Sequence, residues 1–356
     1  MLALACNAAP PARENVRHVI VYHNEREFAG WPANEGMWSW GDEILVAYDI
    51  GKYQKSETGH SVTGRLHYGF SRSKDGGLTW QAEPHPDVLH YVEIKPERTP
   101  YNHGPVNFGA PGFAMKLRQH SYYLSEDRGR TWNGPWRIPR LPDPVPLART
   151  CHIVTGGSSA LVFLTSAPET GHPPTERGRS SVIETKDAGR SWELLSYIGN
   201  DPGAGLPAGQ MPAFSIMPDA VRISPDHFVA AVRCRINRAK WTDIHESTDH
   251  CRTWRKLVRL EQGSNNPVAL AHLGGKAIAA IYGWRGHALG IRARISKDGG
   301  RRWGGEIILR RDASSWDIGY TRAVVRPDGA VVVVYYYTTK ERPQPHIEAT
   351  IWHPDI

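Results

Sequence analysis

Short apolar runs alternate with clusters of Gly, Pro and Asp along the whole chain. The runs are rich in β-branched and aromatic residues, and clear examples span residues 43–48, 160–164, 227–232, 277–282 and 330–337. Runs of this kind, bounded by turn-forming residues, are typical of β-strands. No stretch keeps the 3.6-residue periodicity of an amphipathic helix. The pattern therefore predicts an all-β protein built from many short strands.

A repeated motif of the form Ser/Thr-x-Asp-x-Gly-x-Thr-Trp lies between these runs. It is centred on Asp75, Asp127, Asp187, Asp249 and Asp298. Successive copies are about 50 to 60 residues apart, a length that holds the four strands of one propeller blade. The Asp can accept hydrogen bonds from backbone N–H groups just downstream, and the Gly tolerates a left-handed conformation. These aspartates are therefore predicted to fix turns and to lie away from a central pocket.

The two ends of the chain lie outside the repeat. Residues 317–353 contain strand-like runs but no motif, and a strand near His18 to Tyr22 precedes the first complete unit. The simplest closure lets the N-terminal strand complete the last blade. The expectation is one six-bladed β-propeller domain over residues 14–356, which follows a disordered or signal-remnant segment at residues 1–13.

Composition narrows the classes of function. The chain has 356 residues, of which 40% are hydrophobic and 22% charged, which excludes wholesale disorder. The net charge of +7 suits an acidic substrate as well as it suits nucleic acid, and it does not choose between them. No CxxC pair, phosphate-binding loop, dinucleotide-binding pattern or nucleic-acid motif is present. We therefore expect no cofactor, no metal, no nucleic-acid partner and no membrane span.

The N-terminus carries a separate indication. Small residues precede Cys6, as at the end of a bacterial lipoprotein signal, although a basic region and a full apolar region are missing. The expectation is a secreted, periplasmic or lipid-anchored protein with its anchor at Cys6, and a cytoplasmic protein is the alternative.

The motifs are Asp boxes, and five of them on a six-bladed propeller resemble the sialidase (neuraminidase) superfamily, most closely its bacterial exo-α-sialidase-like group. The resemblance covers nearly the whole chain and is carried by residues 30–34, 38–43, 216–222, 231–235, 282–285, 290–294 and 317–320. It implies an exo-acting glycoside hydrolase that cleaves a terminal sugar from a glycan. An anionic sugar is expected, either sialic acid or another such as a uronate, and a neutral deoxysugar is the alternative.

Sialidases hold the substrate carboxylate with three arginines and use a Tyr nucleophile that a Glu activates. Guanidinium groups suit this role because they stay charged and bind a carboxylate through two hydrogen bonds. The resemblance makes Tyr320 the nucleophile and Arg233 the second arginine. Arg285 or Arg292 becomes the third, and Arg235 is a spare on the same strand face.

The chain departs from the family pattern at the first arginine. The family's Arg-Ile-Pro is replaced by Gly30-Trp31-Pro32, so Trp31 is expected to stack on a sugar ring instead. The remaining binding candidates are residues that adjoin these motifs or precede strand-like runs, namely Trp38, His103, Arg149 and His152.

The acid and base groups also differ from the family. Met217-Pro218 stands where the family has its Glu, so Asp219 or Asp317 is expected to activate the tyrosine. The family's acid/base Asp is not evident before the first Asp box. That region carries Asp49 and His60, either of which could protonate the leaving oxygen.

Two other functions are consistent with the same residues. The missing Arg and Glu suit a non-catalytic propeller that binds glycans. A set of His, Tyr and Arg on one face also suits a uronate-specific polysaccharide lyase, in which His or Tyr removes a proton while Arg neutralises the carboxylate.

Overall fold

The computed structural model is all-β and describes residues 15–84, 104, 106–138, 141–143, 145–147, 149, 151–167, 174–206 and 212–356. The two short helices are α1 (Pro32–Glu35) and α2 (Pro174–Arg177). The first strands are β1 (Val16–Tyr22), β2 (Glu27–Gly30), β3 (Met37–Trp40), β4 (Glu43–Tyr53), β5 (Val62–Ser73), β6 (Gln81–Glu83), β7 (Ala114–Arg118), β8 (Ser121–Ser125) and β9 (Asn133–Arg137). The middle strands are β10 (Val145–Leu147), β11 (His152–Gly156), β12 (Ser159–Ala167), β13 (Arg179–Thr185), β14 (Glu193–Tyr197), β15 (Ala213–Ser224), β16 (His227–Ile236), β17 (Ala239–Ser247) and β18 (Arg255–Gln262). The last strands are β19 (Val268–Gly274), β20 (Ala277–Trp284), β21 (Gly290–Ser296), β22 (Ile307–Arg310), β23 (Gly319–Val325), β24 (Val331–Tyr337) and β25 (His346–Trp352).

Strands that follow one another in sequence pair antiparallel and form successive groups. These groups are β2 to β6, β7 to β9, β10 to β14, β15 to β18, β19 to β22, and β23 to β25 with β1. The groups β10 to β14 and β15 to β18 share one sheet only because Arg179 of β13 and Ser215 of β15 make a single parallel pairing. The sequence therefore folds one group at a time, as short strands joined by tight turns require.

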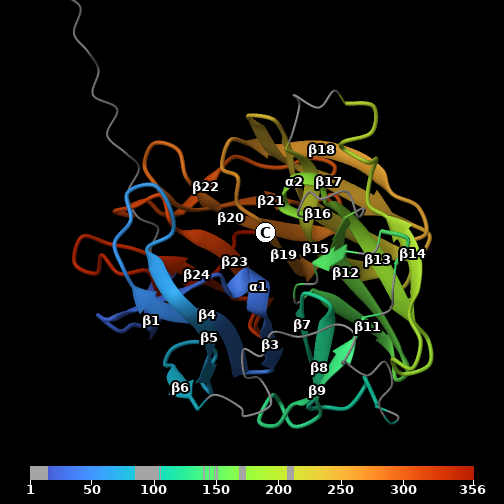
Figure 1. The fold of residues 1–356 in the computed structure, drawn as a ribbon, viewed down its shortest axis with the longest axis horizontal. Coiled ribbons are helices and arrows are strands. Elements are labelled where there is room, and N and C mark those ends of the chain that lie inside the picture. Colours follow the sequence, from blue (N-terminus) through green and yellow to red (C-terminus); the bar gives the residue numbers. More distant parts are fainter. Residues whose placement is uncertain are drawn as a thin grey trace, which may run out of the picture.

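The groups are arranged around a common centre, as Figure 1 shows, with α1, β7, β15, β19 and β23 innermost and β6, β9, β14 and β18 toward the outside. The inner elements touch one another in turn: β11 contacts β15, β15 contacts β19, β19 contacts β23, and β23 contacts α1, which also contacts β7. Segments that are far apart in sequence therefore meet at the middle of the molecule.

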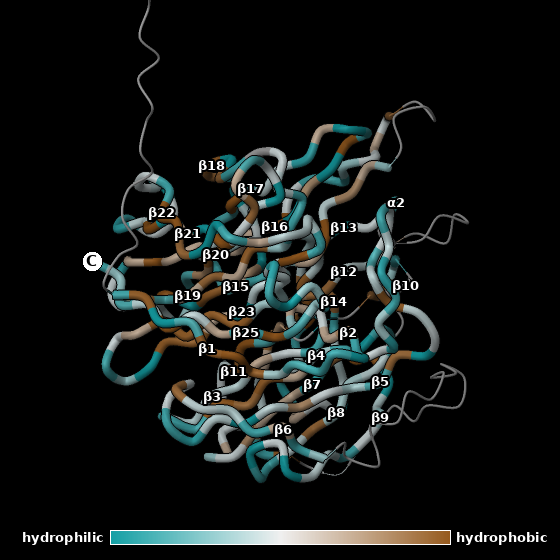
Figure 2. Tube along the Cα trace, turned by 90° about the vertical axis from the view of Figure 1, so that its left-hand side faces the viewer, coloured by the Kyte–Doolittle hydropathy of each residue, from teal (hydrophilic) through white to brown (hydrophobic). Residues whose placement is uncertain are grey.

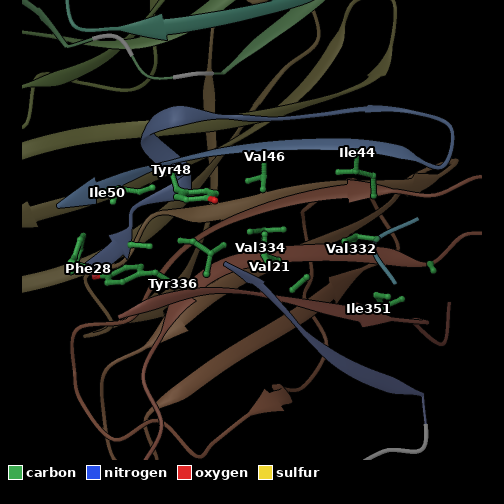
Figure 3. Close-up of a cluster of buried hydrophobic side chains, with 14 residues drawn as sticks. Val21, Phe28, Ile44, Val46, Tyr48, Ile50, Val332, Val334, Tyr336 and Ile351 are labelled. Carbon is green, nitrogen blue, oxygen red and sulfur yellow. The ribbon is translucent and has the colours of Figure 1, made fainter. Parts of the chain in front are cut away.

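Buried hydrophobic clusters join each group to the next. One cluster holds Leu45 of β4 against Tyr123 of β8, and another holds Val229 of β16 against Ala280 of β20. The cluster in Figure 3 closes the series, because Val46 and Tyr48 of β4 pack against Val334 of β24. In Figure 2 the hydrophobic segments are concentrated inside the molecule and the hydrophilic ones in connecting loops. The core is therefore divided among the interfaces between neighbouring groups.

The first and last strands pair with each other. β1 lies antiparallel to β25, with His18 opposite Thr350, and the His18 Nδ1 is 2.9 Å from the Thr350 Oγ1. The prediction that the N-terminal strand completes the last group is confirmed.

The five repeated motifs form turns that each lead from an inner strand to the outermost strand of its group. In the first turn, Asp75 accepts hydrogen bonds from the Thr79 N–H at 2.9 Å and from its hydroxyl at 2.5 Å. The other four aspartates accept the equivalent backbone bond. Three of them also accept the hydroxyl bond, whereas Asp298 accepts from the Arg302 Nε instead. In the fourth copy Cys251 replaces Gly, and it adopts the left-handed conformation itself, with φ of 61°. The carboxylates of these aspartates are bonded within the turns, as the sequence predicts.

Candidate functional site

Tyr320 stands at the centre of the candidate site. It is the second residue of β23 and follows Gly319, and its own φ is 51°. Its hydroxyl lies 3.5 Å from the Arg233 Nη1, which comes from β16. The guanidinium carbon of Arg285, which follows β20, lies 5.9 Å from the centre of the Tyr320 ring. The inner ends of three separate groups therefore bring a phenol and two guanidinium groups together.

The charges around Tyr320 favour its ionised form. Burial alone would raise the pKa of this phenol, but Arg233, Arg149 and Arg285 together overcome that effect and lower it below the usual value near 10. A phenol whose pKa is lowered is more readily converted to the phenolate, which is the nucleophilic or basic form.

The three arginines near Tyr320 are held by neutral groups. Arg233 donates to the Asn265 Oδ1 at 2.9 Å, and Arg149 donates to the Asn34 Oδ1. Arg285 donates to the Ile318 carbonyl at 2.9 Å and to a tyrosine hydroxyl. Within the described residues, no carboxylate forms an ion pair with any of these three arginines, and the Nε atoms of Arg149 and Arg285 are buried without a partner. Such guanidinium groups can bind an anion from outside the chain.

His60, Asp317 and Tyr336 form a second part of the site. The His60 Nδ1 is 2.6 Å from the Asp317 Oδ1, and the Tyr336 hydroxyl donates to the same oxygen at 2.6 Å. Asp317 is buried, whereas 39% of the His60 side chain is exposed. A buried carboxylate that binds one ring nitrogen orients the imidazole and leaves the other nitrogen free to exchange a proton with a substrate.

Aromatic rings connect the two parts. The rings of Tyr320 and Tyr336 have centroids 6.0 Å apart, and Arg285 donates to the Tyr336 hydroxyl at 3.0 Å. Trp31 lies edge-on to the His60 ring, with centroids 4.9 Å apart, and is half-buried. The Trp316 ring is tilted against the His60 ring, with centroids 5.6 Å apart. These rings offer an apolar surface beside the polar groups, as sugar binding requires.

Four non-glycine residues at the site share a strained backbone conformation. Trp31, Met217, Asn265 and Tyr320 have φ between 51° and 55°. A left-handed conformation is costly for bulky side chains and tends to persist at functional sites, where the surrounding structure enforces it. Seven other described non-glycine residues share this conformation elsewhere, Cys251 among them, so the strain accompanies the site but does not locate it by itself.

Asp219 does not contact Tyr320 in the way that activation would require. Its Oδ1 accepts from the Arg322 Nη1 at 2.9 Å, and its Oδ2 accepts from the Leu270 N–H at 2.8 Å. Arg322 also donates to the Ala33 carbonyl at 2.8 Å. This ion pair joins β15, β19, β23 and α1 at the centre, beside a small hollow that Arg149 also lines. The expected role of Asp219 is therefore corrected from activator to link between inner elements.

Asp49 of β4 lies in a buried cluster of charges. Its Oδ2 is 3.5 Å from the Arg118 Nη1, and Glu35 of α1 contacts both Lys116 and Arg118. Burial raises the pKa of Asp49, and the nearby cations Lys116 and Arg149 only partly oppose this. Because Asp49 is only 1% exposed, the structure does not place it where it could protonate a bound sugar.

Several predicted binding residues lie away from Tyr320. Arg292 donates to backbone carbonyls of Arg310 and Ala288, so it joins two strands instead of facing the site. Trp38 is core, because it is 6% exposed and donates to the Met115 carbonyl at 3.3 Å.

Two further candidates have different outcomes. Arg235 donates through its Nε to the Asn237 carbonyl of its own turn at 2.6 Å, and it has no contact with Tyr320. The ring of His152 lies edge-on to Phe113, and burial, together with Arg322, lowers the pKa of this histidine to about 4. The predictions for His103, for Cys6 and for residues 1–13 lie outside the described residues.

The sequence analysis missed several residues that build the site. They are Asn34, Glu35, Lys116, Arg118, Asn265, Arg322 and Tyr336. Two of them carry a signal that could have been used: Lys116 and Arg322 interrupt apolar strand runs with a charge, and a buried charge needs a partner. The asparagines and Tyr336 carry no such signal.

No helix in the described part of the chain is long and apolar enough to cross a membrane. Among the same residues, no group of three or more His, Cys, Asp or Glu side chains is placed to hold a metal ion. Cys151, Cys234 and Cys251 are buried free thiols.

No protein-family model and no curated protein matches the sequence. Solved structures do match. A protein of unknown function from Dyadobacter fermentans is 21% identical, covers 96% of this chain and 100% of its own, and has a TM-score of 0.71. A Hadza microbial sialidase is 17% identical over 90% of this chain and 65% of its own, with a TM-score of 0.56. The family GH93 α-L-arabinofuranosidase of Fusarium graminearum is 11% identical over 94% of this chain and 97% of its own, with a TM-score of 0.55. At these identities the likeness shows the fold: an all-β, propeller-like architecture that is similar to that of glycoside hydrolases.

Proposed function

We propose that the chain is a six-bladed, Asp-box propeller of the sialidase type and an exo-acting glycoside hydrolase that removes a terminal anionic sugar. The observation that carries the proposal is the surroundings of Tyr320: a phenol among Arg149, Arg233 and Arg285, none paired with a carboxylate of the described chain, and beside the His60–Asp317 pair. The similarity in fold to a sialidase and an arabinofuranosidase supports a carbohydrate substrate.

The arginines favour an anionic substrate. Three guanidinium groups close to one phenol repel one another, and burying them costs free energy unless an anion joins them. A carboxylate on the sugar would supply that charge and could accept hydrogen bonds in pairs.

The proposed reaction assigns one step to each group. The Tyr320 phenolate attacks the anomeric carbon, and the bond from this carbon to the leaving oxygen breaks as His60 gives that oxygen a proton. Water then attacks the glycosyl–tyrosine carbon, His60 takes the proton from the water, and the Tyr320 oxygen leaves. Asp317 is a positioning residue for His60 because it binds the Nδ1. Two displacements at one carbon predict retention of configuration.

A panel of aryl glycosides of sialic acid, hexuronic acids and neutral pentoses tests the proposal, with product anomers followed by NMR. The wild-type protein should cleave an anionic member with retention, and Tyr320→Phe should lose activity by about a hundredfold or more. Tyr197→Phe is the matched control, because Tyr197 stacks on Arg179 in an outer strand. An inverted product would remove Tyr320 as the nucleophile, and tight binding without turnover would favour a glycan-binding propeller.

The lowered pKa of Tyr320 also supports a second candidate, a uronate-specific polysaccharide lyase. A phenolate next to guanidinium groups that neutralise a carboxylate could remove the proton next to that carboxylate. Incubation with polyuronates distinguishes the two reactions, because only a lyase produces the ultraviolet absorbance of an unsaturated uronate.

A further inference from the structure

A positively charged hairpin adjoins the candidate site. It is formed by the end of β16 and the start of β17, with Asn237 and Arg238 exposed at its turn. In the register of this pair, Arg235 lies directly opposite Lys240, and Arg233 lies opposite Thr242. Arg233 and Arg235 are two residues apart on one strand, so their side chains share a face with Lys240.

The hairpin is continuous with the arginines around Tyr320. Burial lowers the pKa of Lys240, and electrostatic repulsion from Arg235, Arg233 and Arg285 lowers it further. The ammonium group of Lys240 is therefore close enough to all three guanidinium groups to be repelled by them. Arg233 in turn lies 3.5 Å from the Tyr320 hydroxyl. The positive charge therefore extends from the tyrosine outward along the β16–β17 face.

This arrangement is unfavourable for the chain on its own. Like charges that lie directly opposite each other on neighbouring strands destabilise the pair. The carboxylates of the neighbouring strands do not relieve it: Asp243 points to the other face, where it binds Lys256 at 2.8 Å, and Glu261 accepts from the Thr242 hydroxyl at 2.9 Å. No ion pair involves Arg235 or Lys240 within the described residues. The one hydrogen bond of the Arg235 guanidinium group in this part of the chain is the one from its Nε to the Asn237 carbonyl.

We infer that the hairpin is a second anion subsite, which binds an acidic group on the sugar next to the terminal one. The substrate class is then an acidic oligosaccharide or polysaccharide with charges on successive sugars, such as a polyuronate or a polysialic chain. This inference rests on the proposed function, because the first acidic group is the one held at Tyr320. It adds that the leaving group is also charged.

Binding measurements separate the inference from catalysis. Calorimetry compares galacturonate with trigalacturonate, and sialic acid with α2,8-linked disialic acid, for the wild type and for Arg235→Ala/Lys240→Ala. We expect the wild type to bind one of the longer acidic ligands more tightly than its monomer. The double variant should lose roughly tenfold for the longer ligand and little for the monomer, because only the second charge is affected.

A matched control variant loses the same two positive charges at positions outside the hairpin. Arg190→Ala/Lys297→Ala removes the same two residue types from exposed turns outside the hairpin, and it should bind like the wild type. The preference for the longer ligand should also weaken with added salt, which screens exposed charges. The inference is wrong if the wild type prefers the longer ligand in neither the galacturonate nor the sialic acid pair. It is also wrong if the double variant keeps the full preference. Failure of the proposed function would show separately, as absence of turnover of every glycoside in the panel.

Discussion

The His60 Nδ1 lies 2.6 Å from the Asp317 Oδ1, although 257 residues separate the two in the chain. The pair bridges the first and last groups of strands, and the Tyr336 hydroxyl binds the same carboxylate oxygen. A histidine held this way has one nitrogen fixed and one available, which is the arrangement that a proton donor needs.

Removal of the proton donor should matter most when the leaving group is poor. For His60→Ala we expect turnover of a natural glycan to fall by about 10²–10⁴-fold, the usual contribution of general acid catalysis. A dinitrophenyl glycoside should lose much less, because its leaving group needs no proton. Steady-state kinetics with both substrates measures the difference. His353→Ala, at an exposed position near the C-terminus, is the control. An equal loss for both substrates would count against His60 as the acid.

Removal of one guanidinium group should raise the pKa of Tyr320. Arg233 is the largest of the charges that lower it, so Arg233→Ala should shift the tyrosinate titration to higher pH. The limb of kcat/KM that rises with pH should move the same way, because the phenolate is the reacting form. Ultraviolet difference titration and a pH–rate profile measure both shifts. Arg233→Lys keeps the charge and should restore most of the wild-type value, and an unmoved limb would contradict the electrostatic argument.

Glu35 should be essential for stability. It is fully buried and contacts Lys116, which is also fully buried, so Glu35→Gln leaves a buried cation without its carboxylate. The expected loss is about 3–5 kcal/mol of unfolding free energy. Urea denaturation measures it, and the double variant Glu35→Gln/Lys116→Met should recover part of the loss. Glu57→Gln is the control, because Glu57 pairs with Lys55 at the exposed surface. A loss as small as that of the control would contradict the prediction.

Acid should destabilise the fold through His245. Burial lowers the pKa of this histidine to about 4, against 6.5 for the ordinary group. Between these two values the unfolded chain binds a proton that the folded chain does not, so stability is complete above pH 6.5 and falls as the pH falls toward 4. The contribution is on the order of 3 kcal/mol. In urea titrations, His245→Leu should flatten the slope in this window, and His272→Leu, at a half-buried position, should not. An unchanged slope in His245→Leu would refute the assignment.

The repeated turns could be predicted from sequence because they depend on local signals. The pairing of the chain ends could be predicted for another reason: the repeat leaves a strand-like run over at each end, and the two runs complete one group when they pair. Each Asp75-type motif contains its own hydrogen-bond donors and acceptors, so it defines a turn without help from the rest of the chain. The turn around Cys251 shows that this holds even where the preferred Gly is replaced.

The site was harder to predict because its contacts depend on register between distant groups. Arg233 and Tyr320 come together as expected, but Asp219 binds Arg322, and Asp317 binds His60 instead of Tyr320. A motif tells which residue types stand near the centre. It does not tell which of two carboxylates faces which partner, since that choice depends on how strands from distant groups lie against one another.

The pairing of β1 with β25 has a consequence for synthesis. The ribosome makes β1 long before β25, so β1 has no partner strand until all the groups between them have been made. Until β24 has also been made, Val46 lacks Val334, the residue that it packs with in the cluster of Figure 3. Pairing across so long a separation is slow, and unpaired strand edges invite aggregation. Newly made chains should therefore depend on chaperones until the C-terminal strand emerges, and loss of the last strand should be as harmful as loss of the first.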